Sequence, residues 1–134
     1  MKIGLDLDGT LYGFPEFFKA MIESMVKDGH KFYCASNWKR SKWEWHKKKI
    51  AHLGINPDLI SPELLDSKQH FLRKDGPKNK ARMADQLDVV FDDHADHIQH
   101  LTKTPIMKCP GKKAKKRPSD EDIIDRLKGQ TDVK

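Results

Sequence analysis

The feature that most constrains this chain is an alternation of short apolar segments with longer amphipathic ones. Residues 2–7, 31–36 and 89–91 are short and apolar and run into polar residues, which is typical of strands. Residues 15–28 and 38–53 carry apolar side chains at helical spacing, and a glycine follows each of them. Strands that alternate with helices favour a parallel sheet with helices on both faces, so we expect an α/β fold.

The rest of the chain continues this pattern less clearly. We expect short strands at 58–60 and 105–107, and helices at 78–87, 94–101 and 120–128, whereas 61–77 shows no clear pattern. A length of 134 residues suits one ordinary domain. We therefore predict a core over residues 1–110, and a basic linker with a C-terminal helix over 111–134 that packs on the core or trails from it.

Composition and the first residues of the chain bear on where in the cell the protein is expected. Hydrophobic residues make up 37% of the chain, the mean hydropathy is −0.79, and no apolar run approaches the roughly 18–20 residues that cross a bilayer. The first residues include Lys2 and Asp6, where a signal peptide needs an apolar stretch. Of the two cysteines, Cys34 lies in an expected strand, which suggests a buried, reduced thiol. We expect a soluble cytoplasmic protein with no membrane partner.

Positive charge is concentrated in two segments. The formal net charge is +6, and residues 38–49 and 112–117 each carry +5, which leaves the rest of the chain at −4. Basic patches on a mildly acidic body predict anionic partners at defined places. We interpret the second segment, Lys112 to Arg117, as a solvated tail, with a nucleic-acid or polyphosphate arm as the alternative.

Polar side chains follow three of the expected strands. In chain order they are Asp6, Asp8, Ser36, Asn37, Asp92 and Asp93. Because ligand sites of open parallel sheets lie just beyond the carboxyl ends of the strands, these side chains should meet in one crevice. Four carboxylates there would repel one another without a cation, and hard oxygen ligands favour Mg²⁺. The simpler interpretation is that each aspartate only caps a turn or a helix.

Residues 3–10, Ile-Gly-Leu-Asp-Leu-Asp-Gly-Thr, resemble the first motif of the haloacid dehalogenase superfamily. Ser36 resembles the second motif, a lysine in the helix before the 89–91 strand the third, and Val89 to Asp93 the fourth. The matches follow the family order over residues 3–96. The resemblance implies a Rossmann-like core and phosphatase chemistry.

The resemblance also implies residue roles. Asp6 would be the nucleophile that forms an aspartyl phosphate, and Asp8 would protonate the leaving oxygen and later deprotonate water. Phosphate oxygens would be held by the turn at Gly9 and Thr10, by Ser36 and Asn37, and by a lysine. The Mg²⁺ ion would be bound by Asp6, the Asp8 backbone carbonyl and Asp92, with Asp93 close by. Lys80 fits the lysine role best, and Lys78 is its rival.

The spacing of the motifs leaves little room for a cap. Only 25 residues separate Thr10 from Ser36, and the first helix takes up most of them. The 43 residues between Ser36 and Lys80 hold a helix, an expected strand and the unclear segment. We expect no substantial cap domain, and by resemblance capless members act on large or projecting substrates.

The helix expected at 38–53 begins at the mouth of this crevice. At 100° per residue, Trp43, His46, Ile50 and Leu53 share a core-facing arc. Trp38, Lys42, Trp45 and Lys49 share a neighbouring arc, and indoles interleaved with lysines suit nucleotides or single-stranded nucleic acid. The alternative is that the tryptophans pack on the sheet and the lysines are merely solvated.

We therefore expect a Mg²⁺-dependent phosphomonoester hydrolase acting on a nucleotide or a nucleic-acid terminal phosphate. One alternative keeps the chemistry but takes a phosphoprotein or a small sugar phosphate as substrate. Another is a nucleic-acid-binding module without turnover. His94, His97 and His100 share a helical spacing, but no second ligand cluster accompanies them, so we interpret them as a surface helix and not as a zinc site.

Overall fold

The computed structural model describes residues 1–65 and 75–111. Five strands form one parallel sheet in the order β3-β2-β1-β4-β5. Their bounds are β1 Lys2–Leu5, β2 Lys31–Cys34, β3 Ile60–Ser61, β4 Val89–Asp92 and β5 Ile106–Lys108. The predicted α/β class is confirmed, and the described residues form no separate cap.

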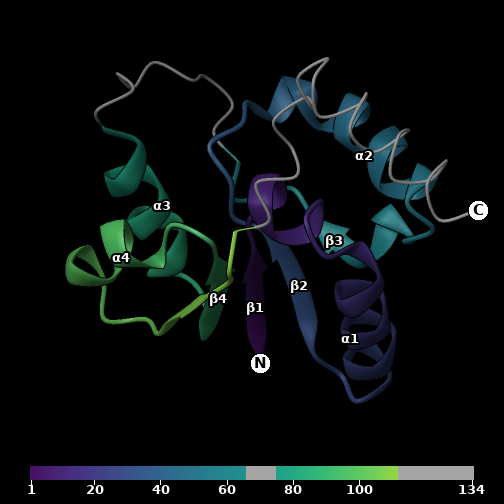
Figure 1. Cartoon of the computed structure of the whole chain (residues 1–134), viewed down its shortest axis with the longest axis horizontal. Helices are drawn as coiled ribbons and strands as arrows, with labels where there is room; N and C mark the ends of the chain where they lie inside the picture. The colour runs from purple at the N-terminus through teal and green to yellow at the C-terminus, as the bar shows by residue number, and fades with distance from the viewer. Residues whose placement is uncertain (66–74, 112–134) are drawn as a thin grey trace, which may run out of the picture.

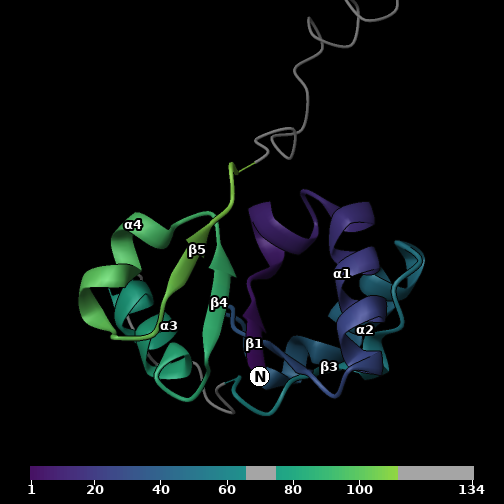
Figure 2. The same ribbon diagram turned by 90° about the horizontal axis from the view of Figure 1, so that it is seen from below.

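Helices cover the sheet on both sides, as expected of parallel strands joined by helical crossovers. Figures 1 and 2 both show α1 with α2 on one side of the sheet and α3 with α4 on the other. The bounds are α1 Pro15–Lys27, α2 Trp43–His52, α3 Gly76–Ala84 and α4 Ala95–Ile98. Shorter helical turns span Leu7–Leu11, Arg40–Lys42, Pro57–Leu59 and Gln99–Leu101. Because β1 lies at the centre of the sheet, the turn that follows it reaches elements from both sides.

The helix predicted to run unbroken from Trp38 begins instead at Trp43, after a 3₁₀ turn over Arg40–Lys42. The backbone of Lys39 is extended (φ −68°, ψ 144°), and the N–H of Trp38 donates to the carbonyl of Ser36 at 2.9 Å. A turn after β2 therefore occupies the positions expected to start the helix. The common arc predicted for Trp38 and Trp45 does not arise from helix geometry.

Other predicted bounds shift by a few residues. The helix expected at 94–101 divides into α4 and a 3₁₀ turn, and β3 begins at Ile60, two residues later than expected. Helix α3 begins at Gly76, two residues earlier, because Pro77 is tolerated in a first helical turn. The expected helix at 120–128 lies outside the described residues.

The core is built from the apolar faces of the strands and from α1 and α3. Phe18 and Ile22 of α1 are buried on one side of the sheet, and Met83 of α3 on the other. Gly4 of β1 is required by close packing, because a Cβ there would lie 2.6 Å from Leu87 Cδ1. Cys34 and Cys109 are both free and buried, which confirms the interpretation of Cys34 as a core thiol.

None of the helices in residues 1–65 and 75–111 is both long enough and apolar enough to span a bilayer.

Candidate functional site

Three aspartates meet at the carboxyl edge of the sheet. Asp6 directly follows β1, Asp92 ends β4, and Asp93 follows it. One carboxylate oxygen from each lies within 4.8 Å of the other two. Asp6 and Asp92 are buried, and Asp93 is half-buried. The predicted convergence of strand-end carboxylates is confirmed for these three residues, and they form a group that could hold a metal ion.

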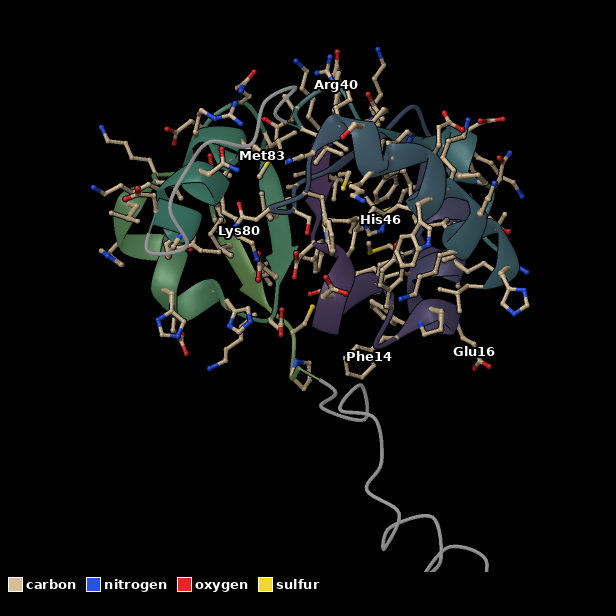
Figure 3. The ribbon with its side chains drawn as sticks, turned by 90° about the horizontal axis from the view of Figure 1, so that it is seen from above. Phe14, Glu16, Arg40, His46, Lys80 and Met83 are labelled. Atoms are coloured by element: carbon tan, nitrogen blue, oxygen red, sulfur yellow. The ribbon has the colours of Figure 1, made fainter. Side chains whose placement is uncertain are left out.

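Lys80 of α3 contacts two of these aspartates. Figure 3 shows it reaching from α3 toward the centre of the molecule. Its Nζ lies 2.9 Å from Asp92 Oδ2 and 3.4 Å from Asp6 Oδ1. Burial lowers the pKa of Lys80, but the carboxylates of Asp6 and Asp92 outweigh it, so the net shift is upward and the ammonium stays charged. Its rival Lys78 is exposed.

Asp6 is held from two sides. Its backbone N–H donates to the carbonyl of Phe91 at 3.0 Å, which continues the pairing of β1 with β4. The Ser36 hydroxyl, from the end of β2, donates to Asp6 Oδ1 at 2.9 Å. Ser36 is itself buried, so this contact lies out of solvent. The carboxylate of Asp6 therefore has a defined orientation before any ligand arrives.

Burial raises the pKa of Asp6 well above its ordinary value. The carboxylates of Asp92 and Asp93 act in the same direction, whereas Lys80 and the Ser36 hydrogen bond oppose the rise. A cation among these oxygens would favour the ionised form, because nearby positive charge stabilises a carboxylate. The protein has thus placed an acidic group where its charge is costly unless a cation joins it.

Asp93 is fixed by the turn that follows β1. Its backbone N–H donates to Thr10 Oγ1 at 3.1 Å. Gly9 has φ 77°, and a Cβ there would lie 2.3 Å from Asp93 Oδ2, so only glycine fits this approach. Asp93 Oδ1 is buried and has no hydrogen-bond partner in the described part of the chain. An unsatisfied buried carboxylate oxygen fits a cation ligand.

Asp8 stands apart from the three clustered carboxylates. Its side chain is exposed, and its Oδ2 accepts a hydrogen bond from the indole N–H of Trp38 at 3.2 Å. The sequence analysis expected four carboxylates in one crevice, whereas the structure brings three together and leaves the Asp8 carboxylate exposed beside Trp38.

Asn37 holds α3 against the end of β2. Its Nδ2 donates to the carbonyl of Gly76 at 3.1 Å, and its Oδ1 accepts from Asn79 Nδ2 at 2.9 Å. These contacts fix the first turn of the helix that carries Lys80. The sequence analysis did not identify Asn79 as a site residue. The one sequence signal for its positioning role is that it directly precedes Lys80.

Residues 42–53, which include α2 and its two flanking positions, divide between a buried face and an exposed one, as predicted. Trp43, His46 and Ile50 are buried, and Leu53 is half-buried. Trp45 is 56% exposed, and Lys42 is exposed in the turn before the helix. The sequence did not single out Tyr12, which packs against His46 from the turn that follows β1.

The three histidines at helical spacing do not form a ligand cluster. His94, His97 and His100 are all exposed, as predicted, but they do not share one helix: His94 precedes α4, His97 lies in it, and His100 lies in the 3₁₀ turn that follows. Among the described residues, the three aspartates are the group whose ligand atoms converge for a metal.

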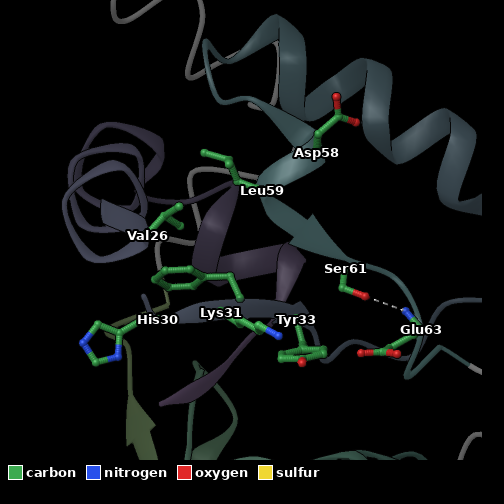
Figure 4. Close-up of a pocket in the computed structure, with 9 residues that line it drawn as sticks. Val26, His30, Lys31, Tyr33, Asp58, Leu59, Ser61 and Glu63 are labelled. Atoms are coloured by element: carbon green, nitrogen blue, oxygen red, sulfur yellow. Dashed lines mark hydrogen bonds between the residues drawn. The ribbon is translucent and has the colours of Figure 1, made fainter. Parts of the chain in front are cut away.

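A cavity of about 350 Å³ lies elsewhere in the molecule (Figure 4). It is lined by residues from the end of α1, the start of β2 and the segment around β3, among them Val26, Lys31 and Leu59. Ser61 and Glu63 line its far side, where the Glu63 N–H donates to Ser61 Oγ at 3.3 Å. None of the clustered aspartates lines it, so we place the candidate site at the aspartates and not in this cavity.

Fold and site together define a small α/β domain with a five-stranded parallel sheet and a buried aspartate cluster that could hold a metal ion. Comparison of the chain with protein-family models, curated proteins and solved structures finds no significant match. What the site can do must therefore be argued from its own residues.

Proposed function

We propose that this protein is a Mg²⁺-dependent phosphomonoester hydrolase that works through an aspartyl phosphate on Asp6, as its resemblance to haloacid dehalogenase-like phosphatases suggests. One observation carries the proposal. The buried carboxylate of Asp6 lies 2.9 Å from the Ser36 hydroxyl and 3.4 Å from the Lys80 ammonium. It also belongs to a group of three carboxylates that fits a hard cation. This combination supplies a nucleophile, donors for phosphate oxygens and a place for the metal.

The donor set suits Mg²⁺. All three converging side chains offer carboxylate oxygens, and one of these oxygens has no partner among the described residues. Asp6, Asp92 and Asp93 would hold the ion through their side chains, and the Asp8 carbonyl is a further candidate ligand. When bound, Mg²⁺ would neutralise negative charge on the phosphoryl group.

The first chemical step belongs to Asp6. One of its carboxylate oxygens attacks phosphorus, a new P–O bond forms, and the bond from phosphorus to the leaving oxygen breaks with its electron pair. Asp8, in its acid form, donates a proton to the leaving oxygen, so an alcohol departs. Lys80 stabilises the charge on the phosphoryl oxygens in the transition state.

The second step returns the enzyme to its starting state. Asp8, now ionised, takes a proton from water as the water oxygen attacks phosphorus. The bond between phosphorus and Asp6 breaks, inorganic phosphate leaves, and both carboxyl groups are as they began. The exposed position of Asp8 suits this work, because both the leaving group and the water approach from solvent.

The experiment measures Mg²⁺-dependent hydrolysis of p-nitrophenyl phosphate by the full chain. Asp6→Asn keeps the size of the side chain but removes the nucleophile, so turnover should fall by several orders of magnitude. Asp96→Asn is the matched control, because Asp96 is exposed, pairs with Lys108 and is not one of the three clustered aspartates. Near-normal turnover by Asp6→Asn would refute the mechanism.

A further inference from the structure

We propose that the substrate is the phosphorylated end of a single-stranded nucleic acid, held along an aromatic and cationic strip that leads away from Asp8. The strip consists of Tyr12, Trp38, Trp45, His46 and Lys49. This inference rests on the proposed function, and it names the substrate class of the same site.

The strip begins at the proposed acid. Trp38 donates its indole N–H to Asp8 Oδ2 at 3.2 Å, and its ring meets His46 edge-on at a centroid distance of 4.6 Å. Trp38 is half-buried, so part of its ring remains open to solvent. A planar group stacked on this residue would lie beside the carboxylate that handles the leaving oxygen.

His46 is the centre of the strip. Figure 3 shows it on the inner side of α2, and Tyr12 stacks on it with an interplanar angle of 16°. The Tyr12 hydroxyl and His46 Nδ1 form a hydrogen bond of 2.6 Å. Burial lowers the pKa of His46, and Lys49 adds to this effect while Asp8 opposes it, so the imidazole is neutral near pH 7. His46 therefore packs as an aromatic ring and not as a cation.

The second nitrogen of His46 is unsatisfied. Nε2 is buried and has no hydrogen-bond partner in residues 1–65 and 75–111. Buried polar atoms in folded proteins nearly always have a partner, so the Nε2 of this ring, which contacts both Trp38 and Trp45, offers a hydrogen bond that no described residue takes. This observation is independent of the exposed aromatic surface and points to the same place.

The outer end of the strip combines a ring with a charge. Trp45 is 56% exposed and contacts His46 edge-on at 4.8 Å. Lys49 Nζ lies 4.2 Å from the ring centre of Tyr12 and 5.3 Å from that of Trp45. An open indole with an ammonium beside it can stack on a base while it contacts a backbone phosphate.

The positive charge near the strip favours some phosphate-bearing substrates over others. Residues 38–49, which carry most of the strip, have a net charge of +5. So much positive charge beside one phosphate site favours a polyanion over a sugar phosphate. The exposed indole favours unpaired bases over a phosphopeptide or a duplex.

The test measures binding of a phosphorylated oligothymidylate by fluorescence anisotropy. It uses the Asp6→Asn chain with Mg²⁺, so that turnover does not consume the probe. Trp45→Ala in this background should weaken binding roughly 5- to 150-fold, the range of one lost base stack. Lys49→Gln should reduce the slope of log Kd against log salt by about 0.7, the value for one phosphate contact on a single strand.

Two control variants are matched to these changes. Phe17→Ala removes another exposed aromatic side chain, which lies on α1 and is 61% exposed. Lys27→Gln removes an exposed lysine from the end of the same helix. Both should leave oligothymidylate binding within about twofold of the parent, because neither residue belongs to the strip.

The outcomes separate the two proposals. If p-nitrophenyl phosphate is hydrolysed in an Asp6-dependent manner, but Trp45→Ala and Lys49→Gln bind the oligonucleotide like the controls, the substrate assignment is wrong and the enzyme assignment stands. If the strip variants lose oligonucleotide binding but no phosphate ester is hydrolysed, the enzyme assignment is wrong. Equal weakening by strip and control variants would also overturn the substrate assignment.

Discussion

We expect Lys80 to stabilise the folded protein by neutralising part of the negative charge of the three aspartates. When all three carboxylates are ionised, the cluster and Lys80 together carry a net charge of −2. Lys80→Met keeps most of the aliphatic chain but leaves the carboxylates without their cation. We expect the metal-free variant to be destabilised at neutral pH.

The distances set the size of this effect. At an effective dielectric constant of about 20, the attraction of Lys80 to Asp92 at 2.9 Å is about 6 kcal/mol, and to Asp6 at 3.4 Å about 5 kcal/mol. The carboxylate oxygens lie within 4.8 Å of one another, so each ionised pair repels by at least about 3.5 kcal/mol. Desolvation of the lysine offsets part of the attraction, and removing one partner of a buried ion pair typically costs about 3–5 kcal/mol. We expect Lys80→Met to lose a similar amount of unfolding free energy.

The loss should depend on pH and on Mg²⁺. Because the pKa of Asp6 is raised in the folded protein, its ionisation destabilises the fold as pH rises above the ordinary value, and protonation at lower pH removes that cost. Removing Lys80 raises the pKa of Asp6 further, so the deficit of Lys80→Met should shrink from pH 7.5 toward pH 5. Added Mg²⁺ should shrink it as well, because the ion replaces the lost charge.

Urea denaturation at both pH values, with and without Mg²⁺, measures these differences. Lys78→Met is the matched control, because Lys78 lies on the same helix but is exposed. A deficit of the same size under all four conditions would show that Lys80 contributes packing and not charge, and would refute the electrostatic account.

Four other variants test the remaining assignments. Metal-free Asp6→Asn should be more stable than the parent at neutral pH, with a flatter dependence of the melting temperature on pH, because the raised pKa of Asp6 makes its charge costly. Asp92→Asn should weaken Mg²⁺ binding in a calorimetric titration more than it weakens phosphate binding, and an unchanged Mg²⁺ affinity would exclude Asp92 as a ligand. Asp8→Asn should slow hydrolysis of alkyl phosphates more than aryl phosphates, whereas equal losses would exclude its role as proton donor. Trp43→Ala should lower the unfolding free energy by about 3–5 kcal/mol, because Trp43 is buried, and a loss near zero would contradict that burial.

The sequence predicts the fold and the aspartate cluster because both follow from local patterns. Apolar segments that end in aspartate predict the strands, and parallel strands place their ends at one edge of the sheet. That rule alone brings Asp6 and Asp92 together, although 86 positions separate them. Lys80 is preferred over Lys78 in the sequence because it lies in the first turn of the expected helix and twelve positions before Asp92. Of these two lysines, the structure places Lys80 against the cluster.

What the sequence could not predict depends on contacts between elements. The extended backbone at Lys39 and the late start of α2 follow a turn after Ser36, a choice that helical propensity does not decide. The contact of Trp38 with Asp8, and the bonds from Asn37 to Gly76 and Asn79, join segments that are 30 or more positions apart. Neither periodicity nor composition carries information about such pairings.

The late start of α2 changes how the strip relates to the chemistry. In an unbroken helix, Trp38 would be one of several side chains along a solvated face, with no predicted contact to Asp8. The turn instead places its indole N–H on Asp8 and its ring on His46. In the proposed enzyme, the Trp38 side chain would therefore contact both the terminal nucleotide and the proton donor, Asp8.

Trp38→Phe should test this link, because it keeps a ring against His46 but loses the hydrogen bond to Asp8. We expect kcat to fall more for alkyl phosphate esters than for p-nitrophenyl phosphate, while oligothymidylate binding weakens less than in Trp45→Ala. Equal losses of kcat on both esters would show that Trp38 contributes stacking alone.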